Sequence, residues 1–144
     1  MFFEHHPDGL ERDAPRDAAS PMRFPWDTIR QRLADAPELV PGRREIALDS
    51  PALATIGLKA MHATRRSSFR HGPTTANAIY AVIEGEGACD VDERGFVWGR
   101  GDVIAVPSGS TMICRTSADS TLLRVGDEPL FERTGWLRPV PVRG

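Results

Sequence analysis

Residues 101–116, GDVIAVPSGSTMICRT, constrain the fold of this chain more than any other segment. Two short runs rich in apolar residues, 103–106 and 111–115, flank the turn signal Pro107-Ser108-Gly109. Short β-type runs on either side of a Pro/Gly turn are typical of strands joined by a tight connection. The segment therefore predicts two strands of an all-β protein, with the turn between them set by Pro107 and Gly109.

The same pattern of short strands and turns begins at residue 45. Gly85-Glu86-Gly87 is expected to form a hairpin turn, and Asp102 is expected to stabilise the turn that precedes residue 103. Strands at such regular spacing favour an antiparallel sandwich or barrel. The predicted strands are 45–48, 55–63, 78–84, 88–91, 95–98, 103–106, 111–115 and 121–125.

Two short helices are expected to flank the strands. Asp27 is the expected N-cap of the first helix, in which Trp26, Ile29 and Leu33 share one face and which ends before Pro37. The second helix covers residues 128–134. Residues 1–20 are polar and aperiodic and are expected to form a flexible arm or linker. Residues 21–144 then form a single domain with a barrel core at about 45–126.

Composition excludes several function classes. The net charge is −2 and no block of basic residues occurs, which argues against nucleic acid and anionic membranes as partners. No segment approaches the roughly 20 apolar residues of a membrane span, and the first residues lack the apolar run of a signal peptide. We therefore expect a cytoplasmic protein. Cys89 and Cys114 are expected to be buried reduced thiols, with a disulfide between them as the alternative.

The spacing within residues 101–116 also resembles the second motif of the cupin superfamily: Gly101, five residues, Pro107, one residue, Gly109, two residues, Met112. This resemblance implies a cupin jelly-roll β-barrel (a double-stranded β-helix) with a pocket in its mouth. Within cupins, the chain resembles the gentisate 1,2-dioxygenase group. The residues that carry this likeness are SPMRFPW at 20–26, PALATIG at 51–57, AIYAVIEGEG at 78–87, FVWGRGDV at 96–103 and LLRVGDEPL at 122–130.

The resemblance implies two cupin domains per enzyme chain, with Fe(II) bound by three histidines in the N-terminal one; this chain resembles the C-terminal, metal-free domain. A metal-binding cupin carries histidine at the position of Met112 and usually asparagine at that of Thr116. Counting back from Gly85 along the first motif gives the other ligand positions, which are Ala78 together with either Gly72 and Thr74 or His71 and Pro73. At best one of four ligands remains, so no metal or other cofactor is expected, and His71 is the only candidate for a surviving ligand.

The pocket candidates are His71, Ala78, Tyr80, Met112 and Arg70. His71 is either a surviving ligand or pocket base, or an unpaired, half-exposed loop histidine, and we favour the loop interpretation. Met112 is expected to pack the vacant barrel interior. Tyr80 shares a face with Ala78.

Arginines form a second group of candidates. Arg70, Arg115 and Arg124 lie on or beside predicted strands, where an inward guanidinium would pair with an aromatic carboxylate. Arg115 is an odd number of residues from Met112 and should therefore face the opposite side. His62 is expected to be an ordinary strand residue.

Three functions remain open. The chain is a metal-free domain with a structural or subunit-contact role, inactive alone and acting beside a metal-bearing cupin, or a stand-alone Fe(II) dioxygenase for a hydroxylated aromatic acid, or a metal-free binder of small aromatic acids. The resemblance to cupins, which commonly pair through sheet edges and N-terminal arms, implies self-association as a homodimer or larger assembly.

Overall fold

The structure is a computed structural model that describes residues 20, 23–50 and 53–141, so residues 1–19 of the expected arm lie outside the described residues. The strands pair in two antiparallel sheets, of order β1-β2-β3-β10-β5-β8 and β4-β9-β6-β7. The elements are α2 (Trp26–Asp35), β1 (Glu38–Val40), β2 (Arg43–Ala47), β3 (Gly57–Ala63), β4 (Ser68–His71), β5 (Ala78–Glu84), β6 (Glu86–Val91), β7 (Arg94–Gly99), β8 (Val103–Val106), β9 (Met112–Thr116), β10 (Ser120–Gly126) and α3 (Glu128–Thr134).

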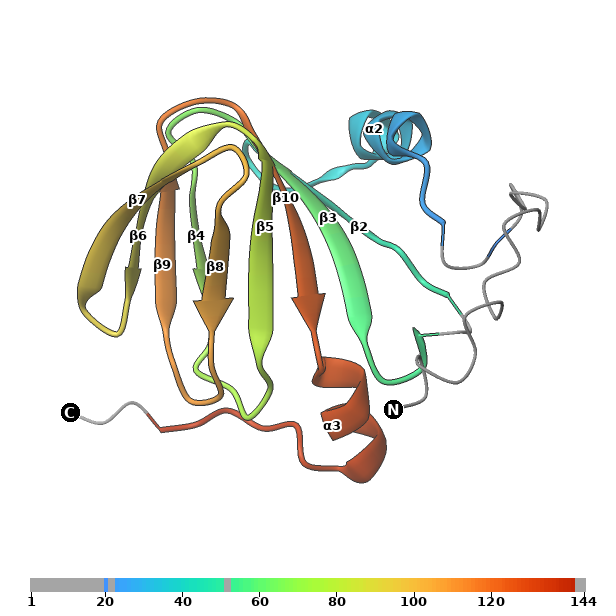
Figure 1. Ribbon diagram of the computed structural model, residues 1–144, viewed down its shortest axis with the longest axis vertical. Coiled ribbons are helices and arrows are strands. Elements are labelled where there is room, and N and C mark those ends of the chain that lie inside the picture. The colour runs from blue at the N-terminus through green and yellow to red at the C-terminus, as the bar shows by residue number, and fades with distance from the viewer. Residues whose placement is uncertain (1–19, 21–22, 51–52, 142–144) are drawn as a thin grey trace, which may run out of the picture.

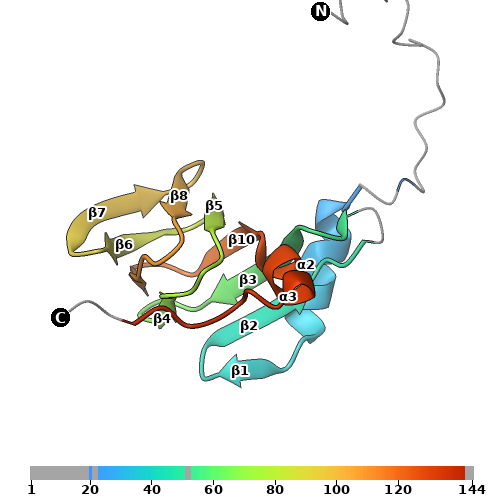
Figure 2. The same cartoon turned by 90° about the horizontal axis from the view of Figure 1, so that it is seen from below.

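The two sheets curve around one apolar interior (Figures 1 and 2). Strand alternation selects the inward side chains, as in β9, where Met112 and Cys114 are fully buried while Ile113 and Arg115 are exposed. Burying each large apolar side chain contributes roughly 1.5–3 kcal/mol, so this cluster is the main source of stability. The interior cluster consists of Met61, Phe69, Ala78, Tyr80, Val82, Cys89, Trp98, Ile104, Val106, Met112, Cys114 and Leu122.

Helix α2 covers the outer face of the larger sheet (Figure 2). Ile29 and Leu33 are buried there against Ala60, which confirms the predicted apolar face of this helix. The N-cap prediction is wrong, because the helix begins at Trp26 and places Asp27 in its first turn, where a carboxylate complements the helix dipole. Helix α3 matches its predicted range and lies beyond the end of β10 (Figure 1). Neither of these helices is long and apolar enough to cross a membrane, in the ranges that the structure describes.

The larger differences from the predicted elements lie at connections. Strands β1 and β4 were not predicted, and several other strands begin or end one or two residues from their predicted bounds. The expected hairpin turn at Gly85 is wrong, since β5 and β6 belong to different sheets. Gly85 has φ 97° at this corner, and an added Cβ would collide with Ser120, so glycine is required there. Asp102 does stabilise its turn, accepting a hydrogen bond from the Gly99 amide at 2.8 Å.

The two cysteines form a disulfide, which corrects the expectation of reduced thiols. Cys89 on β6 lies directly opposite Cys114 on β9, with 4.3 Å between their Cα atoms. Both side chains point into the interior cluster and are almost completely buried. The register of β6 against β9 brings them together, and that register is not readable from their spacing in the sequence.

Reduction of this disulfide should destabilise the protein. The disulfide joins residues 25 apart in the chain. Closing such a loop lowers the conformational entropy of the unfolded chain, and in the loop-entropy description this stabilises the folded protein by about 3 kcal/mol. We expect no thiol to react in denaturant until reductant is added, and the urea midpoint to fall after reduction. The Cys89→Ala, Cys114→Ala double variant is the control, because its urea midpoint should not change when reductant is added. Two reactive thiols in unreduced, denatured protein would contradict the disulfide.

Candidate functional site

Four of the five pocket candidates lie together inside one end of the barrel. His71 is the last residue of β4 and is paired in register with Met112, the first residue of β9. Ala78 and Tyr80 point inward from the start of β5. Their exposed fractions are 7% for His71, 0% for Met112, 3% for Ala78 and 5% for Tyr80. This end of the interior is therefore packed with side chains, and Met112 fills it as expected.

His71 is a buried strand residue with a hydrogen-bond partner, which corrects its interpretation as an exposed, unpaired loop histidine. Its Nδ1 lies 2.9 Å from the hydroxyl oxygen of Tyr80. The two rings meet edge to face, with centroids 5.7 Å apart. Ser68–His71 contains a single aliphatic or aromatic residue, Phe69, so its sequence does not show the apolar alternation that would predict a strand. The pair anchors β4 to β5 across the two sheets.

Burial keeps both members of this pair uncharged at neutral pH. Desolvation and, to a smaller extent, the positive charge of Arg124 together lower the pKa of His71 to about 4. Desolvation raises the pKa of Tyr80 to about 12, although Arg124 acts in the opposite direction. A general acid or base works best with a pKa near the operating pH. The pair is therefore poorly suited to proton transfer at neutral pH and instead forms a neutral hydrogen bond.

Arg124 is the inward arginine of the three that the sequence offered. It is paired in register with Tyr80 on β5 and with Lys59 on β3, so all three lie on the interior side of the larger sheet. Its guanidinium forms an ion pair with Glu128 of α3. Lys59 forms an ion pair with Glu45 at 3.5 Å. Neither Lys59 nor Glu45 was among the sequence candidates: Lys59 is two residues from inward Met61 on the same strand, which was a usable signal, whereas Glu45 faces inward through its pairing with Met61.

Arg70 does not join this group. It is exposed on β4, on the face opposite to His71, and lines a surface cavity with Asp90 and Ile113. Arg115 is exposed as its parity predicted. Within the described part of the chain, no three His, Cys, Asp or Glu side chains lie close enough together to hold a metal ion.

The fold and this interior define a cupin, as the sequence motifs predicted. The salicylate 1,2-dioxygenase of Pseudoaminobacter salicylatoxidans, crystallised as adducts with gentisate, superposes with a TM-score of 0.72 at 19% identity, over 80% of this chain and 35% of that chain. At this identity the likeness establishes the jelly-roll fold alone.

Sequence comparison places this cupin close to the gentisate 1,2-dioxygenase group. A gentisate 1,2-dioxygenase from Streptomyces sp is 30% identical over 106 residues, which are 69% of this chain and 29% of that protein. A 5-aminosalicylate 1,2-dioxygenase from Comamonas sp is 26% identical over 128 residues, 81% of this chain and 34% of that protein. No family profile matches the chain. The chain thus spans about a third of the length of these relatives.

The buried His71 should make the protein less stable in mild acid. Its folded-state pKa of about 4 lies below the ordinary 6.5, so only the unfolded chain takes up this proton between those values. The free energy of unfolding should therefore fall as the pH drops from 6.5 towards 4, by an amount on the order of 3 kcal/mol from this residue.

Urea unfolding across this interval measures the effect, with His71→Gln as the matched variant. Glutamine keeps a hydrogen-bonding side chain but does not titrate, so the variant should lose less stability over the same interval. Equal slopes for the two proteins would contradict the assignment.

Proposed function

We propose that this chain is a cupin domain without an iron site of its own, which has a structural and subunit-contact role and acts beside a metal-bearing cupin. The observation that carries the proposal is Met112, which occupies the motif position of a histidine ligand and is completely buried in the interior cluster. Its thioether is a soft ligand and does not suit Fe(II).

The residues around Met112 fit the same proposal. Ala78 offers no ligand atom, and His71 already shares a hydrogen bond with Tyr80. The cysteine sulfurs bind one another. A non-haem iron centre needs two imidazoles and a carboxylate, or three imidazoles, around open coordination positions. One imidazole in a packed interior does not fit that requirement, so no reaction step is assigned to iron here.

A subunit contact is supported by apolar residues on the outer face of the larger sheet. Ile79 on β5 and Val103 on β8 are 45% and 63% exposed. Ile79 is paired in register with Ala105, and Val103 with Ala81. β8 is also an edge strand. An edge strand beside exposed apolar side chains favours association. We assign this face to a second copy of the chain.

Metal loading tests the missing iron site. Protein prepared without a tag and incubated anaerobically with Fe(II) should retain well below one iron per chain after desalting, and gentisate should cause no oxygen uptake. His5→Gln, His6→Gln is the control variant, because the adjacent histidines near the N-terminus could retain metal adventitiously. Stoichiometric iron that survives this double substitution, or gentisate-dependent oxygen uptake, would instead support the stand-alone dioxygenase.

Light scattering after size exclusion tests the contact. The protein should elute as a dimer or larger assembly, and Val103→Glu should lower its mass because a buried carboxylate would be desolvated in the contact. Val97→Glu is the matched control, since Val97 is 83% exposed on β7 of the other sheet. A monomeric parent protein, or an assembly whose mass is unchanged by Val103→Glu, would contradict the assignment of this surface to a subunit contact.

A further inference from the structure

A row of polar side chains crosses the outer face of the larger sheet, outside the barrel. Adjacent members are paired in register from β1 through β2, β3 and β10 to β5. Cα partners on neighbouring strands lie about 5 Å apart, so the row is a continuous feature whose members are spread along the chain from residue 38 to residue 121. Its members are Glu38, Arg44, His62, Thr121 and Glu84.

A β-bulge places the last member of this row. The register of β10 against β5 shifts between Thr121 and Leu122, so that Thr121 pairs with Glu84 while Leu122 pairs with Val82. Ile83 is the extra residue on β5. In a regular register Thr121 would face Ile83, and an apolar side chain would end the row. The bulge therefore adds a carboxylate to this face and leaves the interior pairing of Leu122 and Val82 intact.

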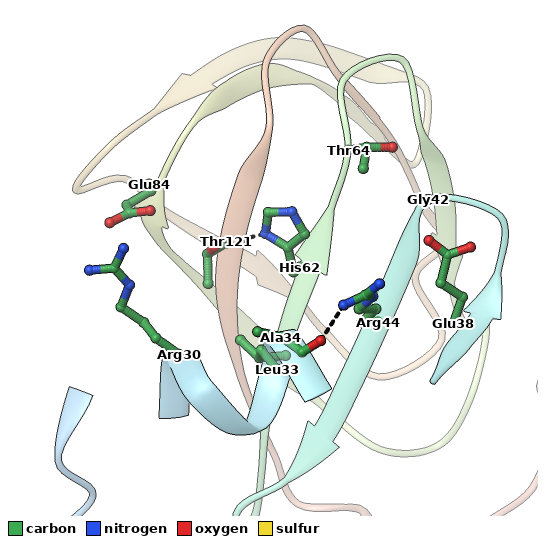
Figure 3. Close-up of a pocket in the computed structure, with 10 residues that line it drawn as sticks. All are labelled: Arg30, Leu33, Ala34, Glu38, Gly42, Arg44, His62, Thr64, Glu84 and Thr121. Atoms are coloured by element: carbon green, nitrogen blue, oxygen red, sulfur yellow. Dashed lines mark hydrogen bonds between the residues drawn. The ribbon is translucent and has the colours of Figure 1, made fainter. Parts of the chain in front are cut away.

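The row and α2 together enclose a cavity of about 420 Å³ (Figure 3). This volume lies within the range of roughly 300–1,000 Å³ that is usual for small-molecule sites. The helix contributes Arg30 and the apolar surface of Leu33 and Ala34. Below the row, the same face of the sheet is apolar and packs against α2 through Ala60 and its neighbours. The cavity is thus amphipathic, with a polar row on one side and apolar helix residues on the other.

The side chains at the β5 end of the cavity have free hydrogen-bonding capacity. Arg30 and Glu84 point toward one another in Figure 3, and neither has an ion-pair partner among the described residues. His62 is held by Thr121, with 3.2 Å between Nδ1 and Oγ1. At the other end, Arg44 donates to the carbonyl oxygen of Ala34 and is already occupied. One cation and one carboxylate that line the same cavity therefore remain available.

We propose that this cavity binds a small zwitterion, an α-amino acid with an apolar side chain, independently of the function proposed for the barrel. The ligand carboxylate pairs with Arg30 and the ammonium group with Glu84. The side chain of the ligand lies over Thr121 and His62 against Leu33 and Ala34. A simple anion would be repelled by Glu84 and a simple cation by Arg30, so a molecule carrying both charges matches this end of the cavity.

Calorimetric titration of the full chain with L-phenylalanine tests the site, beside two matched analogues. 3-Phenylpropionate lacks the ammonium group and phenethylamine lacks the carboxylate. Phenylalanine should bind saturably, and each analogue should bind at least about tenfold more weakly, because each loses one charge-assisted hydrogen-bonding group. In NMR spectra of the same titration, the His62 ring resonances should shift.

Substitutions locate the binding. Arg30→Gln and Glu84→Gln should each weaken phenylalanine binding about tenfold. Both residues are exposed, so neither change threatens the fold. Arg100→Gln and Glu86→Gln are matched controls that lie outside the cavity and should bind like the parent protein. The proposal is overturned if phenylalanine gives no saturable signal at millimolar concentration, if an analogue binds equally well, or if the Arg30 and Glu84 variants bind unchanged.

Discussion

The pairing of β10 between β3 and β5 is the constraint on which the rest of the molecule depends. This strand is hydrogen-bonded along its whole length on one side, from Ser120 opposite Ala63 to Gly126 opposite Gly57. Alternation then sends Leu122 and Arg124 inward and Thr121 and Leu123 outward. The interior cluster, the charged group near Tyr80, the packing of α2 and the polar row on the outer face all include one of these residues.

Much of this fold could be predicted because its strands are short, apolar and separated by Gly and Pro. Strands β5 and β8 and helix α3 match their predicted bounds. Strand β1 has three exposed residues and β4 has one buried apolar residue in four, so neither carries a recognisable alternation. Such strands form because a neighbour supplies their hydrogen bonds, and the neighbour's identity is not written in the local sequence.

The candidate site could likewise be predicted only in part from the sequence. Motif spacing identified Met112 and Ala78 as inward positions, and parity placed Arg115 outside. The disulfide and the pairing of His62 with Thr121 depend on register between strands distant in sequence, and the His71–Tyr80 hydrogen bond depends on how the two sheets face one another. This end of the interior holds the thioether of Met112, the methyl group of Ala78 and the neutral imidazole–phenol pair of His71 and Tyr80, all of which are compatible with an apolar environment.

The bulge at Ile83 has a consequence for how such a barrel can diversify. The register shift at Ile83 sets which β5 side chain lies opposite Thr121 on the outer face, while Val82 and Leu122 keep their pairing inside. At this point the side chain on the outer face of the sheet is set independently of the pair on its inner face. The choice of register at this point therefore sets the surface side chain opposite Thr121 without requiring the core pair of Val82 and Leu122 to repack.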